Sequence, residues 1–289
     1  DAVTRVTFKN SGAIRVEREF FTLRAFVRFC VSNPLNLFAQ GAEQLALQAG
    51  VSPQFAYQVG AIAFDAVITN NGTGASSATF SHTTTGSNRL LAVASGHYSG
   101  VNGTVSSITY AAASLTFITK SANTSFTDTE LWYLMAPASG ANDVVVTYDK
   151  NVERVIGAIS YTGASQTAAL DTSSSTEGGT ANGSINLTTA LDNEAVLSVF
   201  HIYNISVTGN KTSRWNLAAG AGLSNGMGQD EIKATAGATT HSFTHTAEQW
   251  GISIAAFKSV MSSISSSISS SASPSTSISC SPSSSASPS

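Results

Sequence analysis

Apolar and polar residues alternate in short runs along most of the chain, which is the pattern of β-strands with one buried face. The clearest example is the aromatic and aliphatic run 129–135, followed by a turn of Pro, Ser, Gly, Asn and Asp and by the β-branched run 143–149. Such residues favour tight turns between antiparallel strands. The run therefore predicts a pair of antiparallel strands.

The same pattern predicts an all-β fold between residues 60 and 258. Turn clusters such as Asn70-Asn71-Gly72 and Ser175-Thr176-Glu177-Gly178-Gly179 separate the predicted strands, and the apolar runs 195–200 and 252–257 are expected to form the centre of the core. Many short strands with little helix favour a two-sheet antiparallel β-sandwich of the jelly-roll type. The predicted strands are 60–69, 76–82, 89–97, 104–111, 114–120, 128–135, 143–149, 153–161, 184–190, 195–203, 212–217, 229–235, 239–246 and 250–257.

Residues 1–59 form a separate N-terminal arm in this interpretation. Residues 3–9 and 13–19 are expected to pair as a hairpin, and 41–48 is the best helical stretch of the chain, with Gly50 at its end. Residues 21–31 predict a strand with one apolar face that needs a partner. This strand either packs within its own chain or joins a neighbouring subunit by strand addition, through Phe20, Phe21, Leu23, Val27, Phe29 and Val31.

Residues 259–289 are a low-complexity Ser/Pro-rich segment in which Ser271-Ala272-Ser273-Pro274-Ser275 recurs at 285–289. Such a segment has too little apolar surface to offset its ordering entropy, so a disordered-type linker or tail is expected. We also expect the natural polypeptide to continue past Ser289. The first residue, Asp1, is consistent with prior processing or with a chosen boundary.

Composition favours an exported protein. Charged residues make up only 11% of the chain against 42% hydrophobic residues, and the net charge is −3. This balance suits a virion or cell-surface protein, and it gives no electrostatic argument for nucleic acid. No apolar run is long enough to predict membrane insertion. Two cysteines, Cys30 and Cys280, form neither a disulfide framework nor a metal cluster.

The predicted sandwich resembles an uncharacterised family of β-sandwich domains found in tailed-phage virion proteins and in secreted multidomain proteins of bacteria and metagenomes. The resemblance covers about two thirds of the chain, and Ser/Pro-rich linkers like 259–289 are similar to those that flank such domains. The resemblance implies a fold and a setting, and it implies no catalytic residues. The segments are 62–66, 86–93, 105–110, 115–116, 130–134, 137–140 and 160–164.

Catalytic signals are weak. Gly222-Leu223-Ser224-Asn225-Gly226 fits the Gly-x-Ser-x-Gly pattern, with Asp230, His241 and His245 after it, but that chemistry needs a long helix after the serine. The two histidines would lie roughly 13 Å apart on one strand, too far for one metal ion, and we expect both to face solvent. We therefore expect no enzyme, no cofactor and no metal.

Acidic pairs occur at Asp128/Glu130, Asp192/Glu194 and Asp230/Glu231. Calcium sites and glycosidases use such carboxylates, but the ligand spacing of a calcium loop is missing, so solvated turns are the favoured interpretation.

Three aromatic residues are the candidate ligand-binding side chains. Tyr98, Tyr203 and Trp215 lie at predicted strand ends or loops, where they would either stack on sugar rings or cap the core. Trp132 and Trp250 lie within apolar strands and are expected in the core.

The favoured hypothesis is a structural and assembly protein of a virion or an extracellular surface filament, homo-oligomeric or bound to other such subunits through its N-terminal arm. The alternative is a carbohydrate-binding or adhesin module of a phage fibre or secreted protein.

Overall fold

The computed structural model describes residues 5–8, 14–17, 57–59, 61–98, 103–122, 127–203, 205–219 and 224–263. Within these ranges the chain is all-β, without helix, and its strands form several antiparallel sheets. The all-β prediction is confirmed. The predicted apolar strand 21–31, the helix 41–48 and almost all of the Ser/Pro-rich segment lie outside the described residues.

The chain divides into two compact units. In the unit formed by residues 1–56 and 263–289, β1 (Arg5–Phe8) pairs antiparallel with β2 (Ile14–Glu17), which confirms the predicted hairpin. The unit formed by residues 57–262 holds the large sheets. The short strands β3 (Tyr57–Val59) and β19 (Met261–Ser263) pair with each other.

Two long strands replace four predicted ones. β4 (Ala63–Thr84) runs without a break through Asn70-Asn71-Gly72, and β10 (Gly140–Thr162) joins two predicted strands. β4 pairs with β10 over nearly its whole length, with bulges that absorb the turn-type residues. The expected turn at 175–179 is also wrong, because most of it lies in β11 (Leu170–Gly178), which pairs with the strand Trp250–Phe257.

Strands β4 to β10 form one curled, seven-stranded sheet. Its order is β7-β6-β10-β5-β9-β8, and β4 lies along the other edge of β10. The first half of β10 pairs with β6 and the second half with β5, so this sheet turns back on itself. The remaining strands are β5 (Leu90–Tyr98), β6 (Val105–Tyr110), β7 (Ala113–Ser114), β8 (Thr116–Ala122) and β9 (Asp128–Met135).

The following strands form two sheets, of five strands in the order β11-β18-β13-β16-β15 and of three strands in the order β12-β17-β14. A two-sheet sandwich is therefore too simple a description of residues 60–258. The bounds are β12 (Gly183–Thr189), β13 (Glu194–Ile202), β14 (Thr208–Gly209), β15 (Thr212–Ala219), β16 (Ser224–Lys233), β17 (Gly237–Thr244) and β18 (Trp250–Phe257).

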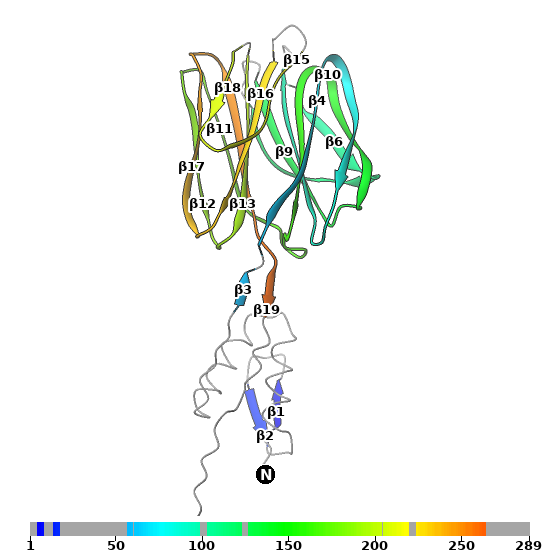
Figure 1. Ribbon diagram of the computed structural model, residues 1–289, viewed down its shortest axis with the longest axis vertical. Helices are drawn as coiled ribbons and strands as arrows, with labels where there is room; N and C mark the ends of the chain where they lie inside the picture. Colours follow the sequence, from blue (N-terminus) through cyan, green and yellow to red (C-terminus); the bar gives the residue numbers. More distant parts are fainter. Residues whose placement is uncertain are drawn as a thin grey trace, which may run out of the picture. The chain divides into compact units, whose positions relative to one another are not determined.

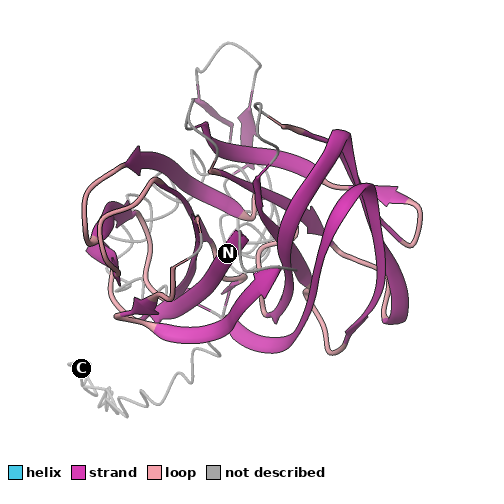
Figure 2. Ribbon diagram, turned by 90° about the horizontal axis from the view of Figure 1, so that it is seen from above, coloured by secondary structure: helices cyan, strands magenta, loops and turns pink. Residues whose placement is uncertain are grey.

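The two halves have the same topology. The order β4-β10-β5-β9-β8 matches β11-β18-β13-β16-β15, and β4-β10-β6 matches β12-β17-β14. Strands β4 and β10 each do alone what two strands do in the second half. We call β4–β10 the first repeat and β11–β18 the second repeat; they lie side by side in Figures 1 and 2.

Details of the backbone repeat as well. Asn88 and Asn193, just before the equivalent strands β5 and β13, both have positive φ, 51° and 55°. Asp65 and Asp171 both occupy a β-bulge beside the last strand of their repeat. Asp65 accepts a hydrogen bond from the Thr85 N–H at 2.9 Å, and Asp171 accepts one from the Ala190 N–H at 2.9 Å. Each aspartate thus fixes the turn that leads into a central strand.

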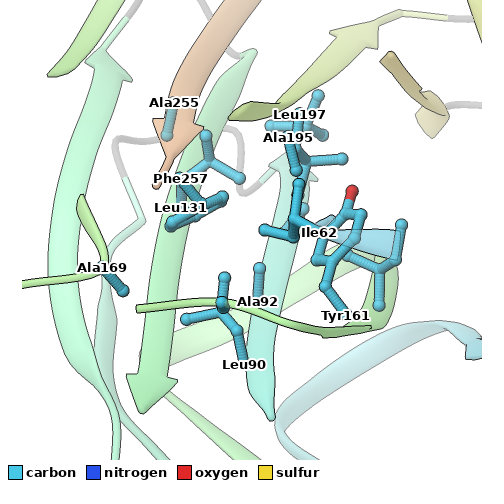
Figure 3. Close-up of a cluster of buried hydrophobic side chains, with 14 of the residues drawn as sticks. Ile62, Leu90, Ala92, Leu131, Tyr161, Ala169, Ala195, Leu197, Ala255 and Phe257 are labelled. Atoms are coloured by element: carbon cyan, nitrogen blue, oxygen red, sulfur yellow. The ribbon is translucent and has the colours of Figure 1, made fainter. Parts of the chain in front are cut away.

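The repeats meet across a shared apolar interface. Side chains from β5, β9 and β10 of the first repeat face side chains from β13 and β18 of the second (Figure 3). Strand β8 packs against β11, and the equivalent strand β15 packs against β4. This reciprocity is that of an isologous dimer, here built from one chain. Interface residues include Leu90, Ala92, Leu131, Tyr161, Ala195, Leu197, Ala255 and Phe257.

Each repeat also has a core of its own. Leu91, Val93 and Ile156 face the interior of the first repeat, and Val196, Phe200 and Ile252 face that of the second. Strands β5 and β13 are therefore buried on both faces. This explains why their sequences are nearly continuous apolar runs, since alternation marks strands with only one buried face.

Trp215 fills a slot between the repeats. A Cβ added at Gly228 of its own repeat would lie 2.1 Å from the indole, and a Cβ added at Gly157 of the first repeat would lie 2.5 Å from it. Trp215 is only 5% exposed. The ring therefore needs both glycines.

We predict that Gly157→Ala destabilises the protein by about 2–3 kcal/mol in urea unfolding, because the methyl group overpacks the Trp215 slot. Gly72→Ala is the matched control on β4, where the nearest atoms belong to the flexible Arg154 guanidinium, at 3.0 Å and beyond. Equal losses for the two variants would contradict the slot.

Candidate functional site

A cluster of charged side chains lies in the first repeat, between β8 and β9. Lys120 Nζ is 3.3 Å from Asp128 Oδ2 and 3.4 Å from Glu130 Oε1. Lys120 stands opposite Glu130 in the strand register, and Asp128 is two residues away on the same face. Glu130 is only 1% exposed. The register thus brings one ammonium group between two buried carboxylates.

Buried hydrogen bonds extend the cluster to His97 on β5. His97 Nε2 lies 3.2 Å from the Gly103 carbonyl oxygen and 3.7 Å from Asp128 Oδ2. Burial lowers the pKa of His97 to about 4, although the Gly103 hydrogen bond opposes this. The ring is therefore neutral at pH 7, and its proton lies on Nε2 because a carbonyl only accepts.

The carboxylates of this cluster take donors from their own chain. Burial raises the pKa of Glu130, against the opposing effects of the Val105 N–H and Lys120. Its Oε1 accepts the Val105 N–H at 3.0 Å, and its Oε2 accepts the Trp132 indole N–H at 3.1 Å. Lys120 also donates to the Gly103 carbonyl and to Thr104. These bonds tie residues 103–105 to β9, which is a structural use of the charges.

A second cluster lies in the second repeat around Glu231. Its carboxylate accepts from Lys211 Nζ at 2.8 Å and from the Thr239 hydroxyl. His241 Nε2 is 3.4 Å from Glu231 Oε1, and its Nδ1 is 2.7 Å from Ser198 Oγ. Burial lowers the pKa of His241 to about 4.

The expectation that His241 and His245 face solvent is wrong. His241 is fully buried, and His245 accepts the Gly183 N–H at 3.0 Å and packs 5.0 Å from Phe200 between ring centroids. His241 and Phe243 on β17, and His245 directly after it, are alternate residues of one extended segment, and all three side chains are buried in the second repeat. Ser198 beside His241 and the Gly183 N–H beside His245 come from distant strands, so these partners are not visible in the local sequence.

Ser224 of the Gly-x-Ser-x-Gly match opens β16 and is fully buried. Its Oγ lies 2.5 Å from Nε2 of His201, a histidine that the sequence did not single out. Burial lowers the pKa of His201 to about 3, and the ring lies so close to Gly96 that an added Cβ there would be 2.9 Å away. The pair therefore fills the interface between the repeats and has no room for a substrate.

The three candidate aromatic residues do not form one site: Tyr98 and Tyr203 meet, whereas Trp215 lies in the glycine slot. Trp215 was expected at a strand end or loop, but it is buried in its glycine slot and offers no face for sugar stacking. Tyr98 and Tyr203 are half-buried and meet at 5.4 Å between ring centroids, one from each repeat. Trp250 is buried in the second core, whereas Trp132 is partly buried against the first. The six candidate assembly residues between Phe20 and Val31 lie outside the described residues.

The solvated-turn interpretation of the acidic pairs holds for Asp192, which is exposed in the turn before β13, but it is wrong for the buried Asp128, Glu130, Glu194 and Asp230. Asp230 accepts from Arg214 Nε at 2.6 Å and from the Tyr161 hydroxyl at 2.9 Å, and Arg214 lies 3.8 Å above the Phe64 ring. Asp192 accepts the Ala236 N–H at 2.7 Å. Among the described residues, no group of three or more His, Cys, Asp or Glu side chains could hold a metal ion. The described part of the chain also has no helix that could cross a membrane.

No protein-family model matches the chain, and no curated protein matches its sequence. The interpretation of the site therefore rests on its geometry.

We predict that His201 makes the protein acid-sensitive. Its pKa is lower in the folded than in the unfolded chain, so the unfolded state binds more protons between about pH 3 and 6.5, and stability is lost as the pH falls through that range. Between pH 7 and pH 4, the free energy of unfolding of the wild type should fall by about 3 kcal/mol more than that of the His201→Gln variant.

The measurement is urea unfolding at both pH values, with Ser224→Ala as the control. That variant removes the hydrogen bond but keeps the histidine, so it should retain the acid sensitivity. An equal loss in His201→Gln and the wild type would refute the assignment.

Proposed function

We propose that each repeat is a jelly roll. In the second repeat, the five-stranded order β11-β18-β13-β16-β15 faces the three-stranded order β12-β17-β14. Consecutive strands therefore alternate between two layers, except for β15 and β16, which pair within the five-stranded sheet, and this pattern resembles two interlocked Greek keys. The equivalent order in the first repeat supports the same assignment. Jelly rolls are common in viral capsid and lectin domains, which supports a setting by analogy of fold alone.

We propose further that the protein is a structural and assembly component of a virion or an extracellular surface filament. The observation that carries this proposal is the reciprocal packing of the two repeats, which is a permanent isologous pair within one chain. Such a pair gives a large rigid body, which an assembly subunit needs.

The polar clusters support a structural role. The carboxylates Asp128, Glu130, Asp230 and Glu231 each take donors or ion-pair partners from the chain itself. Reactive sites instead need groups that can reach a substrate. The N-terminal segment, for which the sequence predicts an apolar face from Phe21 to Val31, supplies the proposed contact between subunits.

The test is the oligomeric state of the full chain, measured by light scattering over a range of concentrations and by electron microscopy. We expect concentration-dependent oligomers. Phe21→Ser/Phe29→Ser should weaken self-association roughly tenfold or more by removing apolar contact area. Thr22→Ser/Arg28→Ser, on the polar positions of the same segment, is the matched control. A wild-type chain that stays monomeric at every concentration would overturn the proposal.

The Tyr98–Tyr203 pair favours a second candidate, a carbohydrate-binding or adhesin module. Two half-buried rings from different repeats could hold a sugar ring by stacking. Binding on a glycan array that Tyr203→Ala abolishes, and that Tyr133→Phe retains, would support this function. An array without any bound glycan would exclude it.

A further inference from the structure

Three side chains of complementary chemistry meet at the edge of the second repeat. Lys258, directly after β18, has its Nζ 3.2 Å from Oδ1 of Asp171 on β11. Glu194, the first residue of β13, is fully buried. The negative charge of Asp171 acts on Glu194, as does the positive charge of Lys258. The amine of Lys258 follows the last strand of the repeat, the carboxyl group of Asp171 lies on the first strand, and the carboxyl group of Glu194 lies on a central strand.

The shared fold does not require this triad. The first repeat keeps the aspartate, as Asp65, in the same bulge and with the same bond to the turn. By strand register, however, Thr162 stands where Lys258 is, and Arg89 stands where Glu194 is. The lysine and the glutamate are therefore additions of the second repeat, and the burial of Glu194 next to this ion pair needs a reason beyond folding.

We propose that Lys258 and Asp171 condense into an intramolecular amide bond, with Glu194 relaying the protons. This cross-link would join the first and last strands of the second repeat.

The two carboxylate oxygens of Asp171 have different partners, and we assign them different roles in the reaction. Oδ1 faces the lysine at 3.2 Å, whereas Oδ2 accepts the Ala190 N–H at 2.9 Å. The lysine nitrogen attacks Cγ with its lone pair, and the electrons of the C–Oδ2 double bond move onto Oδ2. The Ala190 N–H then stabilises the negative Oδ2, as backbone donors do in acyl transfer. When the double bond reforms, the C–Oδ1 bond breaks.

Proton transfers complete the reaction. The amine must first be neutral, and Lys258 is 28% exposed, so it can lose its proton to water. Glu194 gives one proton to Oδ1 during the attack, takes the extra proton from the nitrogen afterwards and passes it to Oδ1, which leaves as water. A proton from solvent then restores the carboxylic acid of Glu194. Burial and the charge of Asp171 raise the pKa of Glu194 to about 7, so its carboxyl group can both give and take a proton near neutral pH. One amide forms, one water is released, and no oxidant or cofactor is needed.

The other Lys–Asp–Glu group provides an internal contrast. Lys120 is also close to Asp128, but its ammonium donates to the Gly103 carbonyl at 2.8 Å and to Thr104 at 3.1 Å. These acceptors remain in place whatever happens to Asp128, so they hold Lys120 in the charged form, which has no lone pair for attack. The charged partner of Lys258 is instead the carboxyl group with which it would react. We therefore assign the condensation to Lys258 and not to Lys120.

The test is the intact mass of the full chain after unfolding. We expect the folded wild type to be lighter than its sequence by one water, and a protease digest to contain the Lys258 peptide joined to the Asp171 peptide. Lys258→Arg, Asp171→Ala and Glu194→Gln should each restore the full mass, whereas Lys120→Arg should stay one water lighter.

A wild-type chain with the full sequence mass after prolonged folded incubation at pH 7 would overturn the cross-link. The same holds for a water lost elsewhere with the two peptides separate, as in a cyclised aspartyl residue. A Glu194→Gln chain that still condenses would refute the role of the glutamate. Because the wild-type mass decides by itself, a variant that fails to fold leaves the test intact, and the outcome is independent of the oligomeric state.

Discussion

The apolar interface between the repeats is the constraint on which the rest of the structure depends. Strands β5 and β13 carry buried side chains on both faces, so neither repeat could be exposed to water alone without presenting a broad apolar sheet. Close approach of the two sheets requires small residues at the contact. His201 and Trp215 of the second repeat occupy the space that a side chain at Gly96 or Gly157 of the first repeat would need.

Many polar groups inside this body are held in local networks of hydrogen bonds and ion pairs. Asp65 and Asp171 fix the turns before the central strands, Asp230 joins Arg214 to Tyr161 across the repeats, and the Lys120 cluster ties a loop to β9. Burying a charge without a partner costs several kcal/mol, so such networks accompany each buried carboxylate. They stabilise and specify the fold, and they explain how Asp128, Glu130, Glu194 and Asp230 can be buried.

Duplication separates what the fold needs from what one copy has gained. The bulge aspartate, the left-handed asparagine before the central strand and the strand order occur in both repeats. Trp215, Lys258 and Glu194 occur in the second repeat, and the first repeat does not have the same residues at the equivalent positions. A comparison of this kind needs no homologous sequence, because the two halves serve as each other's reference.

Local sequence patterns were enough to predict the all-β class, the positions of most strands and the N-terminal hairpin, because alternation and turn residues are local properties. Local patterns could not show that β4 continues through Asn70-Asn71-Gly72, since its long pairing with β10 overrides the turn preference. The repeat left only faint traces in the sequence, such as Thr83-Thr84 and Thr188-Thr189 at equal distances before Asn88 and Asn193. Only the tertiary structure buried Trp215, His201 and His241 and brought Lys258 to Asp171, because the burial and partner of a strand residue depend on which distant strand faces it.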